Sequence, residues 1–295
     1  MQKYDFSRAG FALVAAWCAT LVSQVVIDVV CHFLLPQLYT SPSYYWVVYI
    51  ISVYIVSVPL FVHICGGRGI LRPVEKTMKI TVKDFVRLVV VCLALTYVFN
   101  FVGAMVNEQI SKIVGHTVVN PLTALESTNR MLMFICTGLI SPFTEEIMFR
   151  GVLLKKLRPY GDKLAIWFSA VAFGLYHGNF SQFFYAVAIG VVLGGIVVKT
   201  NRLIYTILLH VAINICGSVI IPGVLEHQNV IISTAGLIGL LALVVYGIVL
   251  ATRMLPHLKT GERLRPGDIQ AAVSNPGVIC FLIASCLMFC SAIFA

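Results

Sequence analysis

Charged residues are scarce in this chain of 295 residues. Aspartate, glutamate, lysine and arginine make up 11% of it, whereas they make up about a quarter of an ordinary soluble domain. Hydrophobic residues account for 59%, and the mean hydropathy is +0.94. So little charge excludes a soluble globular protein and indicates an all-α protein that crosses a membrane several times.

Two metal-binding patterns are also missing. None of the nine cysteines forms a CxxC pair, and all lie inside or at the edge of apolar segments, so neither a thiolate metal site nor a disulfide framework is indicated. No HExxH motif, the helical zinc pattern of many metalloproteases, occurs anywhere in the chain.

A concentrated basic face is absent as well. The formal net charge is +9, but the basic residues are scattered through short connectors. Nucleic acid is therefore not an expected partner, and the positive charge is better explained by membrane topology.

The sequence does contain apolar segments near the length of about 20 residues that spans a bilayer as a helix. They cover residues 10–35, 44–65, 85–106, 130–150, 163–178, 182–198, 203–222, 230–254 and 277–295. We therefore predict one integral membrane domain over residues 1–295, a bundle of eight to nine transmembrane helices, depending on whether 277–295 crosses fully. The first segment starts almost at once and lacks the features of a cleaved signal peptide, so we expect it to be retained.

The basic residues predict the orientation of the bundle. If the N-terminus is cytoplasmic, every lysine and arginine except Lys112 and Arg130 falls in or beside a cytoplasmic connector. Cytoplasmic loops are typically enriched in these residues, so we predict a cytoplasmic N-terminus.

The segment SPFTEEIMFRGVLL, residues 141–154, places charges inside an apolar region. Ionisable residues at such positions usually face the bundle interior, a partner or a water-filled cavity. Glu146 and Arg150 are four residues apart, so on a helix they share a face and can form an ion pair. Glu145 points about 100° away from Glu146 around the helix axis, so it should remain free for chemistry. Alternatively, both acids only neutralise nearby basic residues at the membrane edge.

Two histidines lie in neighbouring apolar segments. AFGLYHGNF places Phe173 and His177 four residues apart, and LLHVAINI does the same for His210 and Asn214. A single intramembrane histidine is most simply an interhelical hydrogen-bond partner. Together with the glutamates, however, these residues supply a base, a proton carrier and neutral donors, the groups needed for attack of water on a carbonyl.

At these positions the sequence resembles the CPBP family of intramembrane proteases. EEIMFR matches its EExxxR motif, FGLYH its FxxxH motif and HVAIN its HxxxN motif, in the family's order. The family includes type II CAAX prenyl endopeptidases and bacteriocin-processing or immunity (Abi) proteins. The resemblance covers about residues 128–220, which would form the catalytic core, while residues 1–127 and 221–295 match only as additional transmembrane helices.

The resemblance implies an endopeptidase and a role for each residue. Glu145 would take a proton from water, His177 would hold that water, and His210 and Asn214 would donate hydrogen bonds to the oxyanion. Glu146, Arg150 and Phe173 would provide structural support. The expected partners are membrane lipid and a peptide or the C-terminal tail of a protein, with or without a prenyl group.

Cofactor use stays open between none and Zn²⁺. Glu145, His177 and His210 could hold zinc with water in the fourth position. The same residues could act without a metal, and we favour that mechanism.

One geometric difficulty accompanies this interpretation. In the predicted topology, His177 lies near the outer face and Glu145 near the inner one. The fifth and sixth segments are short, and the polar loop HGNFSQ joins them. We expect this loop to lie inside the bundle, because non-helical backbone is tolerated at membrane depth where protein or water surrounds it.

Two other functions compete with proteolysis. The first is a non-catalytic membrane immunity or scaffold protein that uses the same polar residues for partner binding. The second is a small transporter, which predicts repeated broken helices that the sequence lacks. The short loops and basic N-terminal residues fit a bacterial plasma membrane, and the aromatic run SYYWVVY at 43–49 fits a membrane interface.

Overall fold

The computed structural model describes residues 2–66, 78–120, 129–258, 260 and 264–294. Within these ranges the protein consists of helices without strands, as predicted. The larger helices are α1 (Gln2–Leu34), α5 (Val82–Val114), α9 (Asp162–Tyr176), α10 (Phe180–Thr200), α11 (Leu203–Ile215), α13 (Val230–Leu258) and α15 (Pro276–Phe294). The shorter ones are α2 (Pro36–Tyr39), α3 (Tyr44–Tyr49), α4 (Val58–Cys65), α6 (Arg130–Met133), α7 (Ser141–Glu146), α8 (Lys155–Leu157), α12 (Ile221–Leu225) and α14 (Pro266–Val273).

Several short helices join through π-helical or 3₁₀ turns into continuous rods. These turns are η1 (Ile50–Ser57), η3 (Phe134–Ile140), η4 (Ile147–Leu154), η5 (Arg158–Tyr160) and η6 (Cys216–Ile220). The rods run over Tyr44–Cys65, Arg130–Tyr160 and Leu203–Leu225. Pro142 is the second residue of α7, which follows η3 directly. Because proline lacks an N–H and displaces the preceding turn, it favours a local change of helical register at this position.

Eight helices or rods among the described residues are long and apolar enough to cross a membrane: α1, Tyr44–Cys65, α5, Arg130–Tyr160, α10, Leu203–Leu225, α13 and α15. The protein is therefore a multi-pass membrane protein. The predicted span at 163–178 is the exception, because it corresponds to α9, a helix of 15 residues, which is shorter than a full crossing. The last segment, 277–295, corresponds to α15 and is long enough.

The cytoplasmic location of the N-terminus stays a prediction. It depends partly on residues outside the described ranges, namely Arg68, Arg72, Lys76, Lys259 and Arg263.

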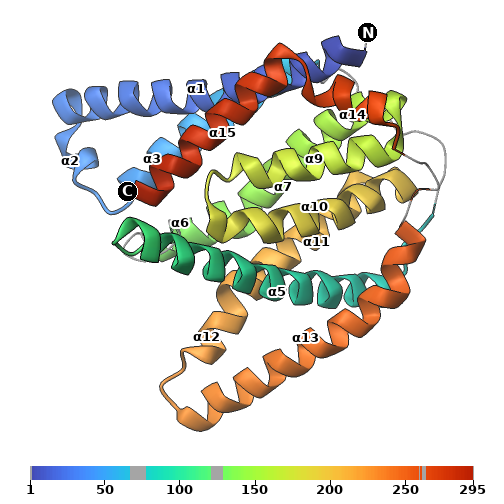
Figure 1. Ribbon diagram of the computed structural model, residues 1–295. Helices are drawn as coiled ribbons and strands as arrows, with labels where there is room; N and C mark the ends of the chain where they lie inside the picture. Colours follow the sequence, from blue (N-terminus) through green and yellow to red (C-terminus); the bar gives the residue numbers. More distant parts are fainter. Residues whose placement is uncertain (1, 67–77, 121–128, 259, 261–263, 295) are drawn as a thin grey trace.

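Helix α10 lies at the centre of the bundle. In its most apolar window 61% of the residues are buried, compared with 11% for α13 at the periphery. Figure 1 shows α10 between α9 and α5, with α1 and α15 side by side along one edge and α13 diverging from α5 toward α12. The three sequence motifs lie on α7 and η4, at the end of α9, and on α11, around this central helix.

Small residues permit the closest helix contacts. A Cβ atom at Gly190 on α10 would lie 2.9 Å from the Ala170 Cα on α9 and 3.3 Å from Arg150 Nη2. At the edge of the bundle, a Cβ at Gly277 of α15 would collide with the Ser7 carbonyl of α1. Close backbone approach of this kind is typical of helix packing in membranes, where small side chains allow more contact between helices.

Polar side chains determine where the central helices begin. Thr81 accepts a hydrogen bond from the Asp84 N–H at the start of α5, and Asn179 accepts one from the Gln182 N–H at the start of α10. Such caps satisfy N–H groups that have no partner within the helix. Asn179 thereby fixes the sharp turn between α9 and α10, which contains His177.

Candidate active site

The two adjacent glutamates of α7 lie in different environments. The Glu146 side chain is completely buried, whereas the Glu145 side chain is 24% exposed. The difference follows from helix geometry, because consecutive residues point about 100° apart. Only Glu145 is therefore accessible to water or to a substrate.

Glu146 forms the ion pair with Arg150 that their spacing predicts. Arg150 Nη1 lies 3.1 Å from Glu146 Oε1, and both side chains have no exposed surface. The geometry is that of a charge pair rather than an aligned hydrogen bond, since no guanidinium nitrogen has a hydrogen-bond partner in the described part of the chain. The Arg150 guanidinium also lies 4.4 Å from the centre of the Phe173 ring, a cation–π contact. Phe173 thus supports the buried charge.

His210 connects the two glutamates. Its Nδ1–H donates to Glu146 Oε1 at 3.0 Å, and its Nε2 lies 3.7 Å from Glu145 Oε2. The ring is almost fully buried, with 5% of the residue exposed. Because the carboxylate of Glu146 only accepts hydrogen bonds, it fixes the ring orientation and directs Nε2 toward Glu145.

Glu145 has two polar neighbours that the spacing argument did not include. The Ser141 hydroxyl, one turn earlier on the same helix, donates to Glu145 Oε1 at 2.5 Å. Glu145 Oε2 faces His210 instead. Sequence spacing was considered only for the Glu146–Arg150 pair, and the serine four residues before Glu145 was not included. The role of Glu145 stays a prediction.

His177 occupies the end of α9 and faces the same region. Its Nδ1–H donates to the Phe173 carbonyl at 2.8 Å, which leaves Nε2 as an acceptor. Its ring packs edge-on against Phe173, whose ring also contacts His210. The His177 ring interacts electrostatically with Glu145 and with His210. The two histidine rings therefore lie against the same phenylalanine ring, and Nε2 of His210 faces Glu145.

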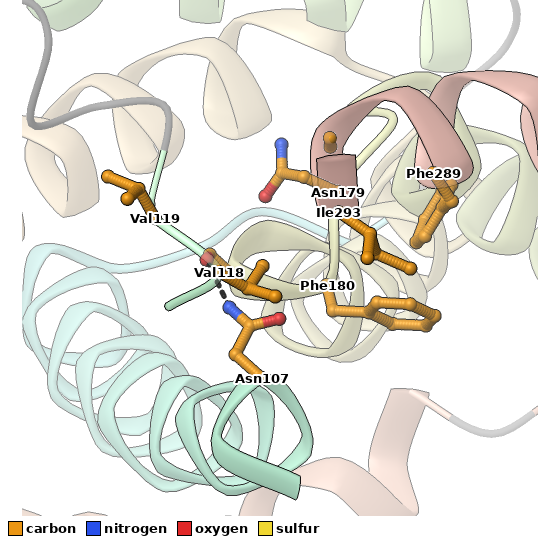
Figure 2. Close-up of a pocket in the computed structure, with 9 residues that line it drawn as sticks. Asn107, Val118, Val119, Asn179, Phe180, Phe289 and Ile293 are labelled. Carbon is orange, nitrogen blue, oxygen red and sulfur yellow. Dashed lines mark hydrogen bonds between the residues drawn. The ribbon is translucent and has the colours of Figure 1, made fainter. Parts of the chain in front are cut away.

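The turn that contains His177 is enclosed by protein, as predicted. Gly178 and Asn179 are buried, and the side chain of Met288 on α15 lies 3.2 Å from where a Cβ of Gly178 would be. On the other side, Asn107 of α5 donates to the Ser181 hydroxyl at 2.8 Å. Figure 2 shows Asn107, Asn179, Phe180, Phe289 and Ile293 gathered at this tip. Packing on both sides of the turn fixes the position of His177.

Asn214 lies one turn after His210 on α11. Its Nδ2 donates to the Thr137 carbonyl of η3 at 2.9 Å. An amide nitrogen carries two hydrogens, so a second N–H remains for another acceptor. The contact with Thr137 fixes the direction of that second N–H.

Tyrosines near Glu145 were not found from the sequence. Electrostatic interactions with Glu145 reach Tyr49 and Tyr54 in the second span, Tyr176 on α9 and Tyr185 on α10. Tyr49 belongs to the aromatic run that is typical of a membrane interface, and nothing in its spacing indicates a glutamate on another span. The site is thus richer in hydroxyl groups than the motifs suggest.

The possible metal ligands Glu145, His177 and His210 do not form a metal site in this conformation. Among the described residues, which include all three, no group of three or more histidine, cysteine, aspartate or glutamate side chains is arranged to hold a metal ion. Zinc ligands must converge to about 2.0–2.2 Å from one point. The donor atoms of these three side chains do not converge, so the zinc alternative does not fit the observed arrangement.

Comparison with known proteins gives one match. Residues 127–216 match the family model described as Rce1-like, type II CAAX prenyl endopeptidase Rce1-like. The predicted resemblance is confirmed over this region, which contains every residue of the three motifs. The matched family is one of proteases and supports a CAAX-type intramembrane protease at the family level. No curated protein and no solved structure matches the chain.

Proposed function

We propose that this protein is an intramembrane endopeptidase in which Glu145 activates water to cleave a peptide bond. The observation that carries the proposal is the position of His210, hydrogen-bonded to the buried Glu146 and facing the accessible Glu145. A partly exposed carboxylate beside two oriented imidazoles is the arrangement needed for general-base catalysis. The family match supports the same reaction class.

The first step would be attack of water on the scissile carbonyl. Glu145 takes one proton from the water, and the remaining hydroxide forms a bond to the carbonyl carbon. His177 accepts a hydrogen bond from the same water through Nε2, because its Nδ1–H is committed to the Phe173 carbonyl. The carbonyl oxygen becomes an oxyanion.

Asn214 and His210 would stabilise this oxyanion. Asn214 has the second N–H of its amide available, while the first is held by Thr137. His210 can donate through Nε2 only when both ring nitrogens carry protons, because Nδ1–H is already donated to Glu146. In the second step the C–N bond breaks, and the leaving amine takes the proton from Glu145.

The substrate proposed for this site is a peptide or the C-terminal tail of a protein. A CAAX-type substrate ends in a prenylated cysteine followed by two aliphatic residues and a variable one. A bacteriocin-processing enzyme would instead cut an unprenylated peptide. The two possibilities share the reaction and differ in whether the lipid group is needed.

The decisive experiment uses purified protein in proteoliposomes with two fluorogenic peptides. One peptide ends in a farnesylated Cys-aliphatic-aliphatic-X sequence, and the other is identical but lacks the farnesyl group. We expect cleavage of the farnesylated peptide, and loss of that cleavage in Glu145→Gln, His177→Ala and His210→Ala. Cleavage of both peptides at similar rates would identify an endopeptidase that does not need the lipid.

A matched control is Glu108→Gln. Glu108 lies on α5, pairs with Lys112 at 2.8 Å and is 66% exposed, so its substitution should leave cleavage unchanged. If neither peptide is cut, or if Glu145→Gln retains activity, the endopeptidase proposal is wrong. A non-catalytic scaffold would then be the better explanation.

A further inference from the structure

Prolines follow three of the π-helical turns, each at the same place. Pro59, Pro142 and Pro222 are the second residues of the α-helices that come directly after η1, η3 and η6. At each junction the residue before the proline donates its N–H to the carbonyl five residues earlier, which is the π-helical pattern. The proline has no N–H with which to continue the pattern, so the next carbonyl loses its helical donor.

At Pro142 the carbonyl concerned is that of Thr137. Ser141 donates its N–H to the Cys136 carbonyl, so Pro142 would be the next donor and Thr137 the next acceptor. Asn214 on α11 supplies the missing hydrogen bond, because its Nδ2–H donates to the Thr137 oxygen at 2.9 Å. A side chain of another span thus replaces the backbone donor that the proline lacks.

The same replacement of a backbone donor by a side chain occurs at Pro222. The preceding N–H again reaches back five residues, which makes Gly217 the next acceptor. The hydroxyl of Tyr97 on α5 donates to the Gly217 oxygen at 3.2 Å. Prolines are tolerated in membrane helices where neighbouring helices satisfy the freed backbone groups in this way. Two junctions of the same kind indicate that the hydrogen bond of Asn214 is a consequence of Pro142.

This hydrogen bond is one of two that join the same pair of helices. Asn214 and His210 lie one turn apart on α11, and they contact Thr137 and Glu146 on the rod that contains η3 and α7. Two contacts at successive turns fix both the spacing and the rotation of one helix relative to the other. Pro142 lies between the two contact points on its rod.

We propose that Pro142 is a positioning residue for the oxyanion donor Asn214. The proposal deepens the proposed function, since it rests on Asn214 as a donor to the scissile carbonyl oxygen. An asparagine side chain rotates about two bonds, and a donor that is fixed in advance stabilises the transition state better than a mobile one. The Thr137 carbonyl holds one N–H of the amide, and the second N–H is directed to the oxyanion.

Two replacements of Pro142 that differ in one backbone N–H test its role in catalysis. Pro142→Ala restores the N–H, so the Thr137 carbonyl regains a donor within its own helix and its hydrogen bond with Asn214 weakens. Lactic acid at position 142, introduced by nonsense suppression, has the same methyl group on an ester backbone without an N–H. For the farnesylated peptide, we expect kcat to fall about 2- to 10-fold in Pro142→Ala and to stay near the wild-type value with lactic acid. KM should change little in both variants.

Thermal unfolding in detergent tests the hydrogen bond itself without any substrate. In wild-type protein, Asn214→Ala leaves the Thr137 carbonyl without its side-chain donor. In the Pro142→Ala background a backbone N–H takes over, so the same substitution should lower the melting temperature by about 2–4 °C less. Pro59→Ala is the matched control, because Pro59 follows a π-helical turn in the same way but on another rod. The effects of Pro59→Ala and Asn214→Ala should simply add.

Each result bears directly on the proposal. Lost packing of the proline ring would affect the alanine and lactic acid variants alike, so equal losses of kcat in the two would overturn the positioning role. A folded Pro142→Ala protein with wild-type kcat would overturn it too. So would equal effects of Asn214→Ala on the melting temperature with and without Pro142→Ala. If neither peptide is cleaved, the proposed function fails, but the melting temperatures still decide whether Pro142 provides the acceptor for Asn214.

Discussion

The Nδ1 atom of His210 lies 3.0 Å from Glu146 Oε1, the same carboxylate oxygen that Arg150 approaches at 3.1 Å. One buried carboxylate thus links the guanidinium to the imidazole that faces Glu145. The two adjacent glutamates therefore have different roles. Glu146 organises charges inside the bundle, and Glu145 is left at the accessible side.

The first prediction distinguishes the two glutamates by how much the substitution of each one changes the stability of the protein. Glu146→Gln leaves Arg150 as a buried charge without a counterion, and breaking a buried pair in this way typically costs about 3–5 kcal/mol. Glu145→Gln keeps a hydrogen-bonding group at a partly exposed position and should change stability little. Thermal unfolding in detergent measures both. We expect a large loss for Glu146→Gln and a near-native midpoint for Glu145→Gln.

A double substitution checks the cause. Glu146→Gln combined with Arg150→Met removes both charges, so it should be more stable than Glu146→Gln alone. Equal instability of the single and double variants would show that packing, rather than the unpaired charge, is responsible.

The second prediction concerns the close contact between α9 and α10. Gly190→Ala would place a Cβ 2.9 Å from the Ala170 Cα and 3.3 Å from Arg150 Nη2, so the helices or the guanidinium must move. Overpacking of this kind costs about 1–3 kcal/mol. The control is Gly239→Ala on α13, where no atom lies within 4 Å of the new Cβ. A Gly190→Ala protein as stable as the control would contradict the assigned packing.

Much of the fold follows from hydropathy, because each long apolar run has to be a helix in a bilayer. The exception, α9, is short because its C-terminal end turns back inside the bundle at Gly178, where φ is +67°. Hydropathy does not distinguish a buried short helix from a spanning one. The shortness of the apolar segment and the polar turn residues HGNFSQ gave the indication.

The site was predictable only where its contacts lie within one helix. The four-residue spacing of Glu146 and Arg150 predicts their pair, because it depends on helix geometry alone. The contacts of His210 with Glu146 and of Asn214 with Thr137 join different spans. Their geometry depends on how the helices pack, which a single sequence does not determine.

The third prediction tests Asn214 as a donor. Asn214→Asp keeps the size of the side chain but replaces its N–H donors with an acceptor, so it should lower kcat by about 10²–10³ fold, as loss of an oxyanion donor does elsewhere. The substrate KM should change little if the donor acts mainly in the transition state.

Asn214→Gln provides a control for this substitution, because it keeps both donors on a longer side chain. Partial activity in Asn214→Gln, with none in Asn214→Asp, would identify hydrogen-bond donation as the cause. Equal kcat values for wild type and Asn214→Asp would remove Asn214 from the oxyanion site.

The fourth prediction concerns metal removal. Among the described residues, which include Glu145, His177 and His210, no group of three or more possible ligand side chains is arranged to hold a metal ion. We therefore expect peptide cleavage to be unchanged after dialysis against a strong chelator. A zinc peptidase treated in the same buffer must lose activity for the comparison to hold. Loss of cleavage by the chelated protein, with recovery on adding Zn²⁺ alone, would show that these side chains rearrange around a metal. Glu145 would then act as a metal ligand rather than as a general base without a metal.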